Sequence, residues 1–587
     1  MIKIIDKLNE ICAQAFTEAG FEAGFGRVSV SSRPDLCQYQ CSGALPCAKA
    51  AHKKPIEIAD AVALILKDSS AFSKVSTCMP GFINMDIAPD FLSSYLDDMA
   101  ADADLGIIKN EKRRIIVDYG GANAAKPLHI GHLRSAVIGE AVKRMGKAAG
   151  HEMIGDVHLG DWGLQMGLII EELKDRGQTE FTLADLEEIY PAASGKSKEC
   201  DENGELTPAA LSFKERALAS TKKLQAGDPE CIAVWKRIME LSKADLKRNY
   251  DNLNVSFELW KGESDVEKYI PDMLSDLTSR GIAREDDGAL VVDIKEDSDK
   301  KEIPPCLIRK SDGAALYATT DLATILEREL LYKPDDYIYV ADKRQDLHYL
   351  SFFRVARKAG MVKDSQGLTF LGFGTMNGKD GKPFKTRSGG VMRLEMLIND
   401  INEAVYNKIR ESRSEDEISD DEAKEIAKTV GLAALKYGDL SNQASKDYIF
   451  DIDRFTSFEG NTGPYILYTI VRIGSILKNY SSQYGSDDVR IGVSKAVSAS
   501  PDALSLGLTL SRFNEVLDSA WKEIAPHRIC QFIYETANNF NTFYHNVMIL
   551  KEEDEELKAS CIALLKLTRS VLLRCIDILG FEAPERM

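Results

Sequence analysis

The chain has 587 residues, of which 44% are apolar and 28% are charged, and its formal net charge is −18. This length and apolar content can build several packed domains, whereas the acidity argues against a nucleic-acid partner held by net charge alone and leaves that role to local basic faces. Eleven cysteines without a CxxC pair, and no apolar run of membrane-spanning length, predict reduced thiols, no metal-binding motif, no membrane partner and a cytosolic location.

Residues 1–108 are predicted to form a small α+β domain. Apolar residues recur at helical spacing over residues 1–16, but Lys3 and Asp6 interrupt the uncharged core that a signal peptide needs, so we expect no signal peptide. The later features of this segment are a helix at 44–51, a strand at 81–85 and a charged linker at 109–113.

Strands and helices alternate over residues 109–395, which predicts an α/β domain with a doubly wound parallel sheet. Ligands of such sheets bind at the carboxyl ends of the strands. Residues from about 175 to 300 interrupt the alternation with charged helical patterns and a short hairpin, and we interpret them as an insertion. The predicted elements are a strand at 114–119, a helix at 129–149, strands near 153 and at 336–340, a helix through 353–359 and a strand at 368–373.

Residues 396–587 are predicted to form an all-α helix bundle. Apolar residues recur three and four apart over 529–547, and a further helix is predicted at 557–579. A polar loop is expected at 481–502, and the acidic run 411–425 is interpreted as solvated helix surface.

The segment 117–138 combines a strand, a glycine turn, a lysine and a His-x-x-His pair. His129 and His132 lie three apart at the start of the predicted helix, where backbone N–H groups and the helix dipole favour an anion. Gly131 removes a side chain where a base or ribose would approach, and Lys126 adds a mobile charge. A surface histidine pair remains an alternative. A zinc site is a weaker one, because no carboxylate or cysteine lies at ligand spacing beside the pair.

A second basic segment, residues 378–390, places lysines and an arginine among glycines, a composition suited to a loop that closes over pyrophosphate. A solvated hairpin tip is the alternative. The cations of this segment are Lys379, Lys382, Lys385 and Arg387.

Several longer stretches resemble the class I arginyl-tRNA synthetases, and the similarity covers nearly the whole chain. They include Asn123 to Ser135, His158 to Gly163, Leu316 to Ala323, Asp342 to Phe353 and Phe458 to Thr469. The resemblance implies a Rossmann-like catalytic domain at 109–395, an N-terminal domain at 1–108 that contacts the tRNA elbow, and a helical anticodon-binding domain at 396–587.

The resemblance also implies an arginine-tRNA ligase. Such an enzyme uses ATP and Mg²⁺ to form arginyl-AMP and pyrophosphate, and then transfers arginine to the 3′-terminal ribose of tRNA(Arg). The ATP site would comprise His129, Gly131, His132 and Lys382, with Lys126, Lys385 and Arg387 assisting catalysis. The usual lysine-rich loop motif is absent, Phe384 to Ser388 stands in its place, and Lys126 resembles the residue that supplies the missing charge.

The side chain of L-arginine requires a carboxylate for its planar guanidinium fork. By resemblance, Tyr317, Asp321 and Gln345 form this pocket, and Asp118 and Asn123 hold the α-amino group and its surroundings. His158 and Asp161 match the second-strand motif that lines the substrate site. A helix cap or a surface ion pair is the alternative role of Asp321. Because a polar pocket left unpaired by a wrong ligand discriminates strongly, no editing domain is required.

Two other functions remain open at this stage. A small-molecule nucleotidyltransferase would also use His-x-Gly-His but would not need the helical C-terminus. A catalytically silent RNA-binding relative is disfavoured by the intact His129, His132, Lys126 and Asp321. We expect a monomer.

Overall fold

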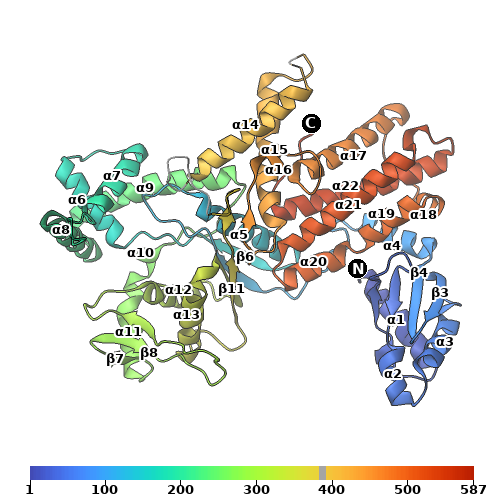
Figure 1. Ribbon diagram of the computed structural model, residues 1–587, viewed down its shortest axis with the longest axis horizontal. Coiled ribbons are helices and arrows are strands. Elements are labelled where there is room, and N and C mark those ends of the chain that lie inside the picture. Colours follow the sequence, from blue (N-terminus) through green and yellow to red (C-terminus); the bar gives the residue numbers. More distant parts are fainter. Residues whose placement is uncertain (383–391, 415) are drawn as a thin grey trace. The chain divides into compact units, whose positions relative to one another are not determined.

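The computed structural model describes residues 1–382, 392–414 and 416–587, and these fall into two compact units. Unit 1 comprises residues 1–110, 457–578 and 582–587, and unit 2 comprises residues 111–456 and 579–581. Figure 1 labels the elements along the chain. None of the described helices is long and apolar enough to cross a bilayer.

The N-terminal part of unit 1 is an antiparallel sheet with helices, as expected for an α+β fold. The strand order is β1-β2-β4-β3, and α1 and α3 pack against each other. The predicted helix at 44–51 and the strand near 81–85 are confirmed. The elements are α1 (Ile4–Glu18), β1 (Val28–Val30), β2 (Tyr39–Cys41), α2 (Ala44–Ala51), α3 (Pro55–Leu66), β3 (Phe72–Cys78), β4 (Phe82–Ile87) and α4 (Pro89–Ala101).

The remainder of unit 1 is helical, as the three-and-four spacing of apolar residues predicts. The expected loop at 481–502 is wrong in part, because one helix continues to Tyr484 and a short helix buries Ala496 and Val497. The helices are α17 (Gly463–Tyr484), α18 (Ser494–Ala499), α19 (Pro501–Ser511), α20 (Phe513–Lys522), α21 (Pro526–Asn546) and α22 (Glu555–Leu579).

Unit 2 is built on a sheet of four strands with the order β11-β10-β5-β6, in which all neighbouring strands are parallel. The predicted doubly wound parallel sheet is therefore confirmed. The chain moves from β5 to β6 on one side and returns to β10 and β11 on the other, so the strand order reverses between β5 and β10. These strands are β5 (Arg114–Asp118), β6 (Glu152–Asp156), β10 (Asp336–Asp342) and β11 (Gly367–Phe373).

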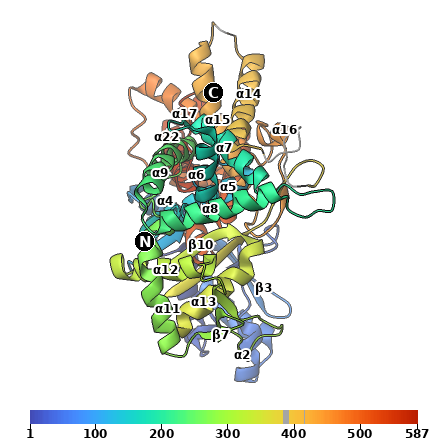
Figure 2. The same cartoon turned by 90° about the vertical axis from the view of Figure 1, so that its left-hand side faces the viewer.

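Three long helices pack on this sheet. α5 (Ile130–Ala148) contacts β5, β6 and β10. α12 (Tyr317–Leu331) and α13 (Asp346–Lys358) share one apolar core with Ile116 of β5 and Tyr339 of β10, and Figure 2 shows the two helices beside β10. The first turns of α5 and α12 therefore lie near the carboxyl ends of the strands.

The predicted insertion is mostly helical and contains a small antiparallel sheet of order β7-β8-β9. α6, α7 and α8 pack together, at the left of Figure 1. The elements are α6 (Leu164–Arg176), α7 (Leu183–Lys196), α8 (Pro208–Gln225), α9 (Pro229–Asn252), α10 (Glu263–Val266), α11 (Ile270–Ser279), β7 (Arg284–Asp286), β8 (Ala289–Val292) and β9 (Cys306–Arg309).

The last part of unit 2 is a helix pair that follows the sheet. The acidic run 411–425 is not one helix surface as predicted, since it spans the break between α14 and α15. Arg134 of α5 forms a buried ion pair with Asp439 of α15, with Nε and Oδ1 2.8 Å apart. The elements are β12 (Met376–Asn377), α14 (Leu394–Ser412), α15 (Asp420–Leu440), β13 (Tyr448–Ile449) and α16 (Ile452–Phe455).

Candidate active site

The site is built at the carboxyl ends of β5 and β6, next to the point between β5 and β10 where the strand order reverses. Asp118 ends β5, Asp156 ends β6, and the loop after β5 leads into α5. Crevices at such a reversal point are where parallel α/β sheets bind ligands. Asn123 in this loop forms a parallel bridge with Gly160, which follows β6, so the two loops are held side by side.

The two predicted histidines cap α5 reciprocally. His129 is the N-cap residue, and its Nδ1 accepts a hydrogen bond from the Gly131 N–H at 3.0 Å. The Nδ1 of His132 accepts from the His129 N–H at 3.2 Å, and the ring centroids lie 4.0 Å apart. This is the histidine counterpart of a capping box. The pair is therefore part of the helix start, unlike an independent surface pair.

Both imidazoles are neutral at physiological pH. Burial, with the neighbouring His129 and Lys126 charges, lowers the pKa of His132 to about 3. Burial and Lys126 also lower the pKa of His129. Because each Nδ1 accepts a backbone hydrogen bond, the single proton of each neutral ring must lie on Nε2. Two Nε2–H donors are thus fixed at the positive end of a helix, which suits an anion.

Gly131 is required by the packing of the histidine cap. A Cβ atom at this position would lie 2.7 Å from Cε1 of His129. Even alanine would therefore displace the imidazole. This reason differs from the predicted one, which was access for a base or ribose.

Lys126 lies on the same loop and contacts the insertion. Its Nζ is 4.5 Å from the centroid of the Tyr190 ring on α7. The preceding residue, Ala125, has a left-handed backbone (φ 63), and its N–H donates to the hydroxyl of Ser242 on α9 at 2.8 Å. The insertion therefore holds both the loop and its lysine.

The second basic segment is described only in part. Lys385 and Arg387 lie outside the described residues. Lys382 is exposed, and its backbone N–H donates to Asp380 at 3.1 Å. Lys379 forms ion pairs with Asp451 and Asp453, at 3.0 and 3.3 Å.

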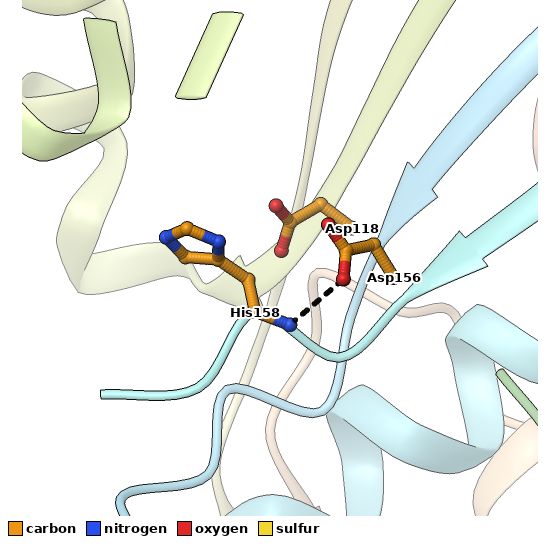
Figure 3. A group of neighbouring side chains, drawn as sticks. All are labelled: Asp118, Asp156 and His158. Atoms are coloured by element: carbon orange, nitrogen blue, oxygen red, sulfur yellow. Dashed lines mark hydrogen bonds between the residues drawn. The ribbon is translucent and has the colours of Figure 1, made fainter. Parts of the chain in front are cut away.

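A buried charge cluster joins the strand ends. The Nη2 atom of Arg328 lies 2.5 Å from Asp118 and 2.8 Å from Asp156. The His158 N–H donates to Asp156 at 3.3 Å, as drawn in Figure 3. One His158 ring nitrogen and the two carboxylates lie within 4.8 Å of one another, and Nδ1 of His158 has no hydrogen-bond partner among the described residues. The guanidinium already supplies a cation to these carboxylates.

A group of acidic side chains begins at the N-terminus of α12. Tyr317 and Asp321 lie one turn apart, and Tyr317 is 74% exposed. The Oδ2 atom of Asp321 is 2.6 Å from Nε2 of His348 on α13. Gln345 is exposed in a short 3₁₀ turn (Lys343–Gln345), and no hydrogen bond of its side chain is found within the described ranges.

Glu263, the first residue of α10, belongs to this acidic group and is not predicted by the sequence motifs. Its pKa is raised to about 7, mainly by burial, and the charges of His158, Asp161 and Asp321 also act on it. In turn, burial and the nearby Glu263 raise the pKa of Tyr317. The backbone N–H of Glu263 donates to the carbonyl of Leu159 at 3.1 Å, so Glu263 lies beside the loop that carries His158. Nothing in its local sequence distinguishes it from the surface acids of the insertion.

Several predicted residues thus fall into three groups, which also contain Asp156, Arg328 and Glu263, none of them predicted from the sequence. The groups are the histidine cap with Lys126, the cluster of Asp118, Asp156, His158 and Arg328, and the acidic group of Glu263, Tyr317 and Asp321. The charge of His158 acts on Glu263, and Tyr190, whose ring contacts Lys126, acts electrostatically on Tyr317.

Comparisons with known proteins agree with this architecture. Family models match for "tRNA synthetases class I (R), catalytic domain" over residues 96–452, "DALR anticodon binding domain" over 466–587 and "Arginyl tRNA synthetase N terminal domain" over 3–87. The chain is 54% identical to an arginine–tRNA ligase of Agathobacter rectalis and 49% identical to one of Alkaliphilus oremlandii, with all of both chains covered.

Solved structures show the same fold. The arginyl-tRNA synthetase of Thermus thermophilus matches with a TM-score of 0.78 at 20% identity, and that of Plasmodium falciparum with 0.77 at 23% identity. Each comparison covers 100% of both chains. With a class I catalytic model over most of unit 2 and full-length relatives at about half identity, the chain belongs to the arginyl-tRNA synthetases of class I.

Proposed function

We propose that this protein activates L-arginine with ATP and transfers it to the 3′-terminal ribose of tRNA(Arg). One observation carries the proposal: the elements at the carboxyl ends of the sheet carry both a pair of neutral hydrogen-bond donors and a group of acids suited to a guanidinium. The donors are His129 and His132, and the acids are Glu263 and Asp321.

The first step needs charge stabilisation more than a base. The carboxylate of arginine attacks the α-phosphorus of ATP, pyrophosphate leaves, and negative charge builds on the phosphate oxygens at the transition state. The Nε2–H groups of His129 and His132 would donate to these oxygens without gaining or losing a proton. Lys126 would add a mobile positive charge once phosphate competes with the Tyr190 ring for it.

Mg²⁺ would reach the site with the nucleotide. The described residues at the start of α5 offer nitrogen donors, whereas Mg²⁺ requires oxygen ligands. The carboxylates of Asp118 and Asp156 are already paired with Arg328. The triphosphate oxygens are therefore the natural ligands of the ion, whose charge would offset that of the phosphates.

The amino-acid pocket distinguishes arginine from lysine by geometry. A guanidinium presents five N–H donors in a plane, and Glu263, Asp321 and the Tyr317 hydroxyl supply acceptors from two helices. Lysine could satisfy one carboxylate but would leave the others unpaired and partly buried, which costs affinity. His348 holds the Asp321 carboxylate in place.

The α-amino group would bind near the strand ends, at Asp118, Asn123 and His158. Asn123 is fixed by its bridge to Gly160, and Asp118 keeps a side chain that is 16% exposed. The roles proposed for Gly131, Gln345, Lys382, Lys385 and Arg387 in nucleotide and arginine binding remain predictions.

The tRNA would use the domains outside the catalytic core. Residues 1–108 are proposed to contact the elbow and residues 396–587 the anticodon, in keeping with the N-terminal and anticodon-binding family models. The full domain assignment, a monomeric state and a cytoplasmic location are further predictions.

Two assays on the full-length protein test the function. ATP–pyrophosphate exchange should depend on both arginine and tRNA(Arg), and labelled arginine should be transferred to purified tRNA(Arg). A His132→Ala variant should slow exchange by at least about tenfold, because it removes one charge-stabilising donor, while leaving the KM for arginine nearly unchanged. Exchange driven equally by lysine would contradict the proposed specificity.

A further inference from the structure

Arg328 is a buried arginine that the proposed reaction does not use directly. It lies on α12, seven residues after Asp321, and its side chain is 1% exposed. A guanidinium this deeply buried persists only when it is paired and hydrogen-bonded. Its partners therefore indicate what it does.

Those partners come from three neighbouring strands. Nη2 of Arg328 reaches Asp118 at the end of β5 and Asp156 at the end of β6, at 2.5 and 2.8 Å. Nη1 donates to the hydroxyl of Tyr339 on β10 at 3.3 Å. The helix that carries the guanidinium pocket is thus tied to the strand ends that would receive the α-amino group.

The two carboxylates bound by Arg328 are not equivalent. Asp156 is 1% exposed, and its Oδ1 accepts from the His158 N–H at 3.3 Å. Asp118 is 16% exposed, and Arg328 contacts only its Oδ2. No hydrogen bond to Oδ1 of Asp118 is found in the part of the chain that the structure describes. Figure 3 shows the His158 ring near the Asp118 carboxylate.

Charge counting shows what the cluster lacks. Two carboxylates face one guanidinium, and the ligand atoms of Asp118, Asp156 and His158 lie within 4.8 Å of one another. When both carboxylates are ionised, they carry one negative charge more than Arg328 supplies, and Asp118 is the more exposed of the two. The α-ammonium group of an amino acid carries one positive charge and three N–H donors. It can therefore balance this negative charge and donate to Oδ1 of Asp118.

We propose that Arg328 is a positioning residue that orients Asp118 to bind the α-ammonium group of the substrate. Arg328 binds Oδ2 of Asp118, balances the charge of Asp156 and leaves Oδ1 of Asp118 free to accept from the ammonium group. Without it, the two adjacent carboxylates would share a proton, since like charges this close do not both ionise freely. This inference rests on the proposed function, because it assumes arginine as the substrate.

Three ligands distinguish the contact between Asp118 and the α-ammonium group from the other contacts of the substrate. Arginine has both the amino and carboxylate groups, agmatine keeps the amino group but lacks the carboxylate, and 5-guanidinopentanoate keeps the carboxylate but lacks the amino group. Their dissociation constants are measured by calorimetry on the full-length wild-type protein and on Arg328→Met and Arg328→Lys. Binding is read directly, so the result does not depend on catalysis.

Arg328→Met is expected to weaken arginine and agmatine by at least about tenfold and 5-guanidinopentanoate by less than about threefold, since one charge-assisted hydrogen bond is lost only by ligands with the amino group. Arg328→Lys keeps the charge but cannot reach both carboxylates equally, so it should restore part of the selective loss. This second variant preserves the test should the methionine variant fold poorly.

Arg134→Met is the matched control, because it removes another buried ion pair of unit 2, with Asp439. It should shift all three ligands by similar factors. Equal weakening of the three ligands in Arg328→Met, no change, or tighter binding of the amino-bearing ligands would overturn the positioning role and leave the proposed function standing. A wild-type protein that binds neither arginine nor agmatine would overturn both.

Discussion

Arginine affinity should depend on pH through Glu263. Burial raises the pKa of this carboxyl to about 7. Such a group is about one-tenth ionised at pH 6 and about nine-tenths ionised at pH 8. Because only the carboxylate accepts hydrogen bonds from a guanidinium at full strength, the KM for arginine should be about tenfold higher at pH 6 than at pH 8.

Replacing Glu263 by Gln removes the charge but keeps the shape. Losing one charge-assisted hydrogen bond costs on the order of 1.5–3 kcal/mol, so the KM for arginine at pH 8 should rise about ten- to hundredfold. At pH 6 the variant and the wild type should differ far less, because the wild-type carboxyl is then mostly protonated. Steady-state ATP–pyrophosphate exchange from pH 6 to 8 measures both values.

Glu267→Gln is the matched control for this experiment. Glu267 also has a pKa raised by burial, and it lies one turn beyond Glu263 without the charged neighbours of the pocket. This variant should keep the wild-type pH dependence. A wild-type KM that is flat from pH 6 to 8, or a Glu263→Gln variant with an unchanged slope, would refute the assignment of Glu263 to the pocket.

The carboxylate of Glu263 should lower the stability of the folded protein at the pH at which it binds arginine. The folded-state pKa of Glu263 lies above the ordinary value of 4.5, so its contribution to stability is present below pH 4.5 and is lost as pH rises through about 7. Glu263→Gln should therefore increase the free energy of unfolding at pH 8 by about 2–3 kcal/mol. Denaturant unfolding without arginine measures the difference.

Three further variants test the rest of the site. Gly131→Ala places a Cβ 2.7 Å from the His129 ring, so exchange should slow at least about tenfold at unchanged arginine KM; normal exchange would argue against the cap. Asp321→Ala should raise the arginine KM by about a hundredfold with the ATP KM within about twofold, and equal changes in both would contradict a guanidinium pocket. Tyr190→Leu removes a cation–π contact of about 0.5–1 kcal/mol from Lys126, so the ATP KM should fall about two- to fivefold, and a rise would refute the contact as a restraint.

The sequence predicts the catalytic fold well where the pattern is local. A β-branched strand, a glycine turn and the helix start follow one another between Arg114 and His129, and the structure places β5 and the start of α5 there. The parallel sheet is predicted correctly because strands and helices alternate. The polar run at 481–502 is predicted less well, since the helix there depends on burying Ala496 and Val497.

The site contacts that escape prediction are those made across the sequence. Glu263 comes from the insertion and acquires its raised pKa only through folding beside His158 and Asp321. Arg328 forms an ion pair with Asp118, which lies 210 positions earlier in the sequence. No periodicity or short motif carries this information, because burial and charge pairing are properties of the assembled fold.

The reciprocal cap at the start of α5 makes the chemical step insensitive to acidity. The Nδ1 of His129 accepts from the Gly131 N–H and the Nδ1 of His132 accepts from the His129 N–H, and His132 would gain a proton only near pH 3. The turnover number should therefore lack the bell-shaped pH profile of acid–base histidine enzymes. Mild acidification should then lower the activity of this protein only through weaker substrate binding.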